Sequence, residues 1–276
     1  MTLFARQDVQ NLPNQVGKNA NLANWPLFIC LLGGFYVLKA GSPLVLKNPD
    51  KIRALLSNLA IQDQLGASRE HLIQTLWPNT QVELAGHALN SLVHNLYKLL
   101  GAAIGGARPV IHQDGYYQLN VDAGIGVDIA YFDRLTREAN YQEKAGQLIT
   151  AIRTYERALE LYRGDLCMVS NTQALIICES LRARYLTVLA RLADYYFDNR
   201  NYADCLVYAF RLLATDPCRE DAHRIIMRCY VRQGERAQAL QQYRVCTAIL
   251  RSEFNIAPEP ATESLYQQIQ FNPDAV

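Results

Sequence analysis

Residues 82–119, VELAGHALNSLVHNLYKLLGAAIGGARPVIHQDGYYQL, decide the fold of the N-terminal half of the chain. Their first half has the i, i+3, i+4, i+7 spacing of an amphipathic helix, with apolar residues at Leu89, Leu92, Val93 and Leu96. We predict a helix over Val82–Leu100, with Gly101 as the C′ residue that ends it. The opposite face of this helix is polar, so we expect it to face solvent.

The second half of this stretch predicts a β-hairpin. Val110–His112 and Tyr116–Leu119 are β-prone, and Gln113-Asp114-Gly115 lies between them. Asp and Gly tolerate the positive φ that a tight hairpin turn demands. Because neighbours on a strand face opposite ways, one of Tyr116 and Tyr117 must enter the core, and we expect Tyr116 to do so.

A small antiparallel sheet and two shorter helices are predicted upstream. The β-prone runs are Leu27–Leu32, Phe35–Leu38 and Leu44–Leu46. The helices cover about Asp50–Ile61 and the residues from Ser68, a candidate N-cap, to the Trp77-Pro78 stop. A sheet, three helices and a terminal hairpin form a winged helix-turn-helix, in which the third helix can enter the major groove of DNA.

Beyond the glycine-containing segment 120–128, the sequence is almost entirely helical in pattern. One offset of 34 residues, the tetratricopeptide period, relates Tyr196 to Tyr230, Ala203 to Ala237 and Leu206 to Leu240. A third unit, Gly146-x4-Ala151-Ile152-x2-Tyr155, precedes its counterpart Gly234-x4-Ala239-Leu240-x2-Tyr243 by 88 residues, or two repeats plus a 20-residue insertion around Leu166–Cys178. Such repeats stack helix pairs around a concave partner-binding face.

We therefore expect a mainly α fold with a small β component. Its three parts are a flexible tail over 1–24, a winged-helix domain over 25–124 and a helical-repeat domain over 125–276. The longest apolar run, Leu27–Gly34, is too short to cross a bilayer, and no basic signal-peptide region precedes it. The seven cysteines form no C-x-x-C pair and are typical of thiols in a reducing cytoplasm.

Charge and motifs limit the function classes. The net charge is +1, with 9 Lys+Arg against 7 Asp+Glu in residues 1–125 and 18 against 19 in the remainder, so any DNA contact depends on local placement. There is no G-x-S-x-G, no Walker lysine loop and no H-E-x-x-H, and neither the cysteines nor the five histidines cluster. We predict no catalytic residue, no metal, no cofactor and no membrane partner.

A series of short motifs follows the first strand in a fixed order. They are Gly41-Ser42-Pro43, Lys51-x-Arg53-Ala54-Leu55-Leu56, Ser68-Arg69-x2-Leu72-Ile73-x2-Leu76-Trp77, Ala88-Leu89, Leu99-Leu100-Gly101, Gly115-Tyr116, Val127-Asp128-x3-Phe132-x2-Leu135, Tyr162-Arg163-Gly164-Asp165 and Phe254-Asn255-Ile256-Ala257-Pro258-Glu259-Pro260. Together they resemble bacterial regulators of the Streptomyces antibiotic regulatory protein type, in which an OmpR-like winged helix precedes a bacterial transcriptional activator domain.

The resemblance implies a ligand and a mechanism. The ligand is double-stranded promoter DNA, and the mechanism is recruitment of RNA polymerase through its sigma or alpha subunit, or contact with another regulatory protein; a homodimer fits both. One segment departs from the family, where the third helix usually ends in a run like Ser-Arg-Leu-Arg-Arg. Here His94-Asn95-Leu96-Tyr97-Lys98 replaces it, and fewer arginines should lower affinity and flatten its salt dependence.

Two groups of residues are candidates for DNA contact. The outward face of the third helix carries groups that can reach base edges, Asn by a bidentate pair with adenine, at His87, Asn90, Ser91, His94, Asn95 and Lys98. Phosphate contacts are expected at helix starts and beside the hairpin, at Lys51, Arg53, Arg69, Arg108, His112 and Tyr117. Each group equally fits an ordinary solvated surface.

Two alternatives remain open. In the first, the winged helix has lost DNA readout, and the protein is an interaction module whose repeats hold a protein partner. In the second, the apolar insertion around Leu166–Cys178 senses a small molecule. The tyrosines of the repeats fit either a ligand groove or, by default, repeat packing.

Overall fold

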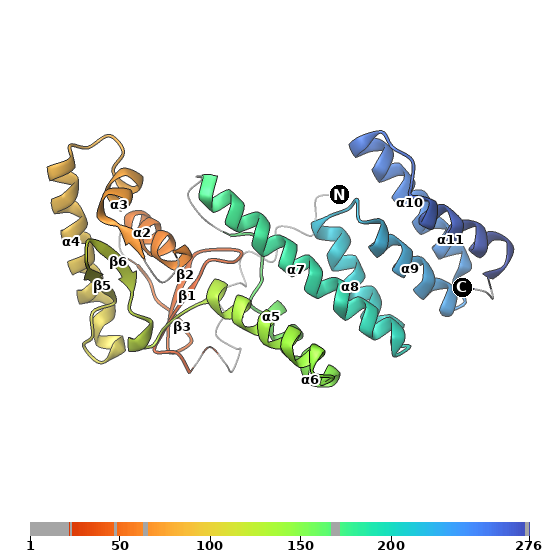
Figure 1. Cartoon of the computed structure of the whole chain (residues 1–276), viewed down its shortest axis with the longest axis horizontal. Coiled ribbons are helices and arrows are strands. Elements are labelled where there is room, and N and C mark those ends of the chain that lie inside the picture. Colours follow the sequence, from red (N-terminus) through yellow and green to blue (C-terminus); the bar gives the residue numbers. More distant parts are fainter. Residues whose placement is uncertain (1–21, 23, 47–48, 63–65, 167–171, 274–275) are drawn as a thin grey trace. The chain divides into compact units, whose positions relative to one another are not determined.

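The computed structural model describes residues 22, 24–46, 49–62, 66–166, 172–273 and 276 (Figure 1). The predicted tail lies outside these residues except for Leu22, which is buried, and Asn24. Part of the predicted insertion, residues 167–171, also lies outside them. The described residues fold as two compact units, the first within residues 1–147 and 156–181 and the second within residues 148–155 and 182–276. The prediction of a mainly α fold with a small β component is confirmed.

The first unit begins with a four-stranded sheet in the order β3-β2-β1-β7. Its strands are β1 (Leu27–Cys30), β2 (Tyr36–Lys39), β3 (Ser42–Pro43) and β7 (Ile125–Val127). β2 pairs antiparallel with β1, whereas β7 pairs parallel with it. The domain boundary expected at 124/125 therefore falls just before a strand of the N-terminal sheet.

The third β-prone run, Leu44–Leu46, was predicted as a strand, and this is wrong. Leu44 N still donates to the Val37 carbonyl at 2.8 Å, but the chain then leaves the sheet and Val45 is 87% exposed. The pairing strand is the polar Ser42–Pro43 segment. The chain stays beside β2 from Ser42 to Leu44 and then turns away from it, so Val45 and Leu46 do not continue the strand.

The helix-turn-helix follows the sheet. Its helices are α2 (Pro49–Ile61), α3 (Arg69–Leu76) and α4 (Val82–Leu100), which match the predicted spans closely. The predicted N-cap is confirmed, since the Ser68 side chain accepts a hydrogen bond from His71 N at 3.2 Å. The apolar faces of the three helices pack on the sheet in one buried core.

The role predicted for Gly101 is wrong. Gly101 has the right-handed helical conformation, φ −58°, and the chain continues into the 3₁₀ helix η1 (Gly101–Ile104). The left-handed residue that ends the turn is Gly105. At Gly101 a Cβ would lie 3.0 Å from the Tyr97 ring, so this glycine provides space and not a left-handed turn.

The hairpin is the wing. β5 (Val110–Gln113) and β6 (Tyr116–Leu119) pair around Asp114 and Gly115, which both have positive φ as predicted. A short strand, β4 (Ala67–Ser68), adds to β6 and leads directly into α3. The wing is thus joined to the start of α3 by backbone pairing.

The first unit also holds α5 (Asp128–Lys144), the end of α6 (Leu148–Leu159) and the start of α7 (Thr172–Asp198). Asp128 is fully buried and accepts hydrogen bonds from the backbone N–H groups of Leu31 at 2.7 Å and Leu32 at 2.8 Å. Arg163 Nη2 lies 4.0 Å from the same carboxylate. One buried side chain therefore joins the end of β1, the start of α5 and the segment after α6.

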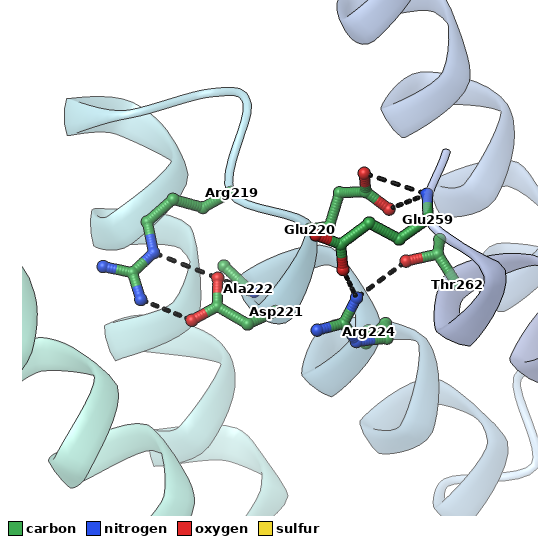
Figure 2. A network of polar contacts seen from close by, with 7 residues as sticks. All are labelled: Arg219, Glu220, Asp221, Ala222, Arg224, Glu259 and Thr262. Atoms are coloured by element: carbon green, nitrogen blue, oxygen red, sulfur yellow. Dashed lines mark hydrogen bonds and ion pairs between the residues drawn. The ribbon is translucent and has the colours of Figure 1, made fainter. Parts of the chain in front are cut away.

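The second unit continues the repeat through α8 (Tyr202–Thr215), α9 (Glu220–Arg232), α10 (Arg236–Phe254) and α11 (Pro260–Phe271). α8 and α10 begin 34 residues apart, as the sequence period predicts. The last helix is held by polar contacts (Figure 2): the Glu220 carboxylate accepts from Glu259 N at 2.9 and 3.1 Å, and Arg224 Nη1 donates to Thr262 Oγ1 at 2.9 Å. No sequence pattern indicates this network, because it joins residues 38 and 39 positions apart.

The pH dependence of stability follows from the burial of Asp128. Burial raises the pKa of its carboxyl from 3.8 to about 6, against the lowering effects of the Leu32 and Leu31 N–H groups and Arg163. The folded state therefore binds a proton more tightly than the unfolded state, and the stability that Asp128 contributes falls as pH rises from about 4 through about 6. Relative to Asp128→Asn, the free energy of unfolding of the wild type should drop by about 2.4 kcal/mol between pH 4 and 7, measured by urea denaturation. A difference that does not change with pH would contradict this.

A repeated turn gives a second prediction. Gly146, Arg200 and Gly234 each lie two residues before the start of a repeat helix, and their φ values are 76°, 59° and 80°. The left-handed conformation is strained for any residue with a Cβ, so Arg200 stands where the other repeats have glycine. Arg200→Gly should raise the free energy of unfolding by about 0.5–1 kcal/mol, measured by thermal unfolding. Arg228→Gly, at an exposed position in the interior of α9, is the control and should lower it by about 1 kcal/mol.

Candidate nucleic-acid interface

The outward face of α4 is the centre of the candidate interface. The face opposite is buried through Ala85, Leu89, Leu96 and Leu100. All six side chains predicted to read DNA are exposed: His87, Asn90, Ser91, His94, Asn95 and Lys98. The structure thus brings these six together on one surface, as their helical spacing requires.

Arg69 links three elements at this surface. Its backbone N–H donates to the Gly115 carbonyl in the wing turn at 3.1 Å. Its Nη1 donates to the Tyr117 hydroxyl on β6 at 2.8 Å and to Asn90 Oδ1 on α4 at 3.1 Å. The first residue of α3 therefore fixes the wing against α4, a role that the sequence did not reveal.

The expectation for the two wing tyrosines is wrong. Tyr117 is only 2% exposed, whereas Tyr116 is 44% exposed. The cause is the register of the three-stranded sheet: β4 pairs Ala67 with Tyr117, and both side chains enter the core. His112 is exposed and stacks on the Tyr117 ring, with centroids 4.2 Å apart, so it marks the outer surface of the wing.

The two basic residues of α2 contact the protein itself. The Lys51 ammonium donates to the Leu76 carbonyl at the end of α3 and lies 5.2 Å from the centroid of the Trp77 ring. The Arg53 guanidinium lies over the Phe35 ring at 5.7 Å. Both remain exposed, but their charges already have partners.

Two hollows flank Asn90. The hollow between α4 and the wing has a volume of about 440 Å³, and its lining includes His94, Arg108 and His112. The other hollow, between α3 and α4, has a volume of about 370 Å³ and is lined by Glu70 and Glu83 as well as by Arg69 and His87. Asn90 belongs to both linings. The wing side of Asn90 thus carries one arginine and no acidic group, whereas the other side carries two acidic groups beside Arg69.

Within the part of the chain that the structure describes, no three His, Cys, Asp or Glu side chains lie close enough to hold a metal ion. No described helix is long and apolar enough to span a membrane.

Residues 127–270 match the family model described as the bacterial transcriptional activator domain, and the chain belongs to this family. The resemblance drawn from the sequence motifs is thereby confirmed.

Two proteins named as regulatory proteins match most of the chain. The chain is 27% identical over 240 residues to Regulatory protein AfsR of Streptomyces coelicolor, and the matched region covers 87% of this chain and 24% of AfsR. It is 22% identical over 242 residues to Transcriptional regulatory protein MoaR1 of Mycobacterium tuberculosis, covering 87% of this chain and 78% of MoaR1. The chain spans about a quarter of AfsR.

A solved structure shares the fold. It is EmbR of Mycobacterium tuberculosis in complex with a low affinity phosphopeptide, with a TM-score of 0.73 and 23% sequence identity, covering 90% of this chain and 65% of EmbR. The chain therefore shares its fold with this solved structure.

The tyrosine pair offers a direct test of the wing. Tyr117→Leu should lower the free energy of unfolding by about 2 kcal/mol or more, because it removes a buried ring and leaves the Arg69 guanidinium without one acceptor. Tyr116→Leu, on the neighbouring exposed position, should change it by less than about 0.5 kcal/mol. Equal losses in the two variants, measured by urea denaturation, would refute the observed register.

Proposed function

We propose that the protein is a transcription regulator that binds double-stranded DNA through α4 and the wing and binds a protein partner through its helical repeats. The observation that carries the proposal is the exposed polar face of α4 beside the wing. In a helix-turn-helix this helix lies in the major groove, and a wing contacts the adjacent backbone. Arg69 holds the wing and α4 in one rigid arrangement, which suits such two-part contact.

The charges available to DNA are few. Lys98 at the C-terminal end of α4 and Arg108 beside the wing are exposed or line the hollow, and neither side chain has an ion-pair partner among the described residues. Lys51 and Arg69 already have partners within the protein. A slope of log affinity against log salt near −2 to −3 per bound copy is therefore expected.

The repeats are the proposed partner-binding part. Stacked helix pairs present an extended surface to a protein ligand. We propose RNA polymerase, through its sigma or alpha subunit, or another regulatory protein as the partner, and a homodimer as the DNA-bound form. Promoter DNA as the specific ligand and the absence of a catalytic role belong to this same proposal.

A second candidate function has its own support. Val82 and Leu84 in the first turn of α4 are 72% and 60% exposed, and Glu70 and Glu83 line the hollow beside them. Exposed apolar and acidic groups suit a protein partner better than a phosphate backbone. In this candidate the winged helix is a docking surface that does not bind DNA.

DNA titrations across salt separate the two candidates. The wild type should bind duplex DNA from upstream of its own locus at least tenfold more tightly than random duplex DNA, because base contacts add to phosphate contacts. The double variant His94→Ala with Lys98→Ala should lose about tenfold in affinity and reduce the salt slope by about 1.

Lys144→Ala is the matched control, because it removes a lysine from the last turn of α5 and should leave both values unchanged. Equal affinity for upstream and random DNA, with no effect of the double variant, would reject DNA readout. Retention of a co-purified partner by the Val82→Ser, Leu84→Ser variant would reject the docking candidate.

A further inference from the structure

The orientation of the Asn90 amide indicates which base α4 would read. This inference rests on the proposed DNA binding. Asn90 is exposed near the middle of α4, and its side chain accepts a hydrogen bond from Arg69 Nη1 at 3.1 Å. An asparagine amide has one accepting end, Oδ1, and one donating end, Nδ2. The end that faces Arg69 is already engaged by one hydrogen bond, so the other end is the freer one for contact with DNA.

The donor groups of Arg69 determine which end of the Asn90 amide faces it. A guanidinium has only donors, so a hydrogen bond to Arg69 requires that Oδ1 face it. The reversed amide would place donor against donor. Nδ2 therefore points away from Arg69, and no described residue accepts a hydrogen bond from it.

Arg69 is itself held in place. The same Nη1 donates to the buried Tyr117 hydroxyl at 2.8 Å, and the Arg69 backbone is bound to Gly115. The guanidinium also lies against α4 where Gly86 leaves room, since a Cβ there would lie 2.7 Å from Nη2. These contacts make the guanidinium a fixed part of the surface.

We propose that Arg69 fixes Asn90 as a hydrogen-bond donor, so that α4 reads guanine at this position and not adenine. Guanine presents two acceptors in the major groove, O6 and N7, which match the two N–H groups of Nδ2. Adenine presents an acceptor and a donor, and its N6 amino group would have to share Oδ1 with the guanidinium. Arg69 acts as a positioning residue and Asn90 as the reading residue.

Selection from a pool of synthetic duplexes with a randomised central segment tests the proposal on the full chain. The wild type should enrich guanine at one position, and Asn90→Ala should abolish that preference alone. Guanine should be preferred over adenine by about tenfold. Inosine, which keeps O6 and N7, should bind like guanine there, whereas 7-deazaguanine, which lacks N7, should bind more weakly.

Freeing the amide should change the base. Arg69→Met removes the donor, so the preference should move from guanine to adenine. Gly86→Ala should cause the same shift without removing a charge, because its Cβ displaces the far end of the Arg69 side chain. Since alanine favours helix, this second variant keeps the test valid if Arg69→Met fails to fold. Arg137→Met, which removes an arginine of α5, is the charge control and should leave the base preference unchanged.

The outcomes are distinct. A wild-type site with adenine at the Asn90-dependent position, or a guanine preference that survives both Arg69→Met and Gly86→Ala, overturns this inference but leaves DNA binding intact. Selection of no sequence at all removes the proposed function and the inference with it.

Discussion

The buried carboxylate of Asp128 is the constraint on which the first unit depends. It accepts backbone hydrogen bonds from Leu31 and Leu32, at the end of the central strand, and from Ile129 N at 2.9 Å in the first turn of α5. A buried carboxylate is costly unless donors surround it, so its three N–H partners and Arg163 must assemble together. Gly33 and Gly164 pack so closely beside this cluster that a Cβ on Gly33 would lie 2.7 Å from the Arg163 backbone. The family motifs around Val127-Asp128 and Tyr162-Asp165 therefore meet in one cluster at the end of β1.

The candidate interface is built outward from this frame. The sheet supports α2, α3 and α4 through a single core, and α4 presents its polar face to solvent. At the surface, Arg69 connects the wing to α4 by donating hydrogen bonds to both. Asp128 connects the sheet to α5 in the same way, with one charged side chain that bonds to groups on several elements. The two residues differ in burial: Asp128 is enclosed and holds segments of backbone together, whereas the contact between Arg69 and Asn90 is exposed and sets the polarity of a surface group.

Much of the fold is predictable from local patterns, and the failures have one physical cause. The bounds of α4, the Asp114-Gly115 turn, the Ser68 cap and the 34-residue repeat follow from spacing and turn chemistry. Ile125–Val127 is too short and glycine-containing to be recognised as a strand, and only its partner β1 makes it one. Likewise, the local sequence does not show which of two adjacent tyrosines faces the core. Pairing with Ala67, far away in sequence, decides that Tyr117 is the buried one. The exposed face of α4 was predictable from helical period, but the contact of Arg69 with Asn90 joins residues 21 positions apart and needs the assembled domain.

The proposed interface is the face formed by α4 and the wing, which binds duplex DNA of particular sequence. Footprinting of genomic DNA with the purified full chain tests it most directly. Discrete protected sites are expected within promoter regions, with protection in the major groove where α4 enters and on the adjacent backbone where the wing lies. Uniform cleavage at every protein concentration at which the chain remains folded would contradict it.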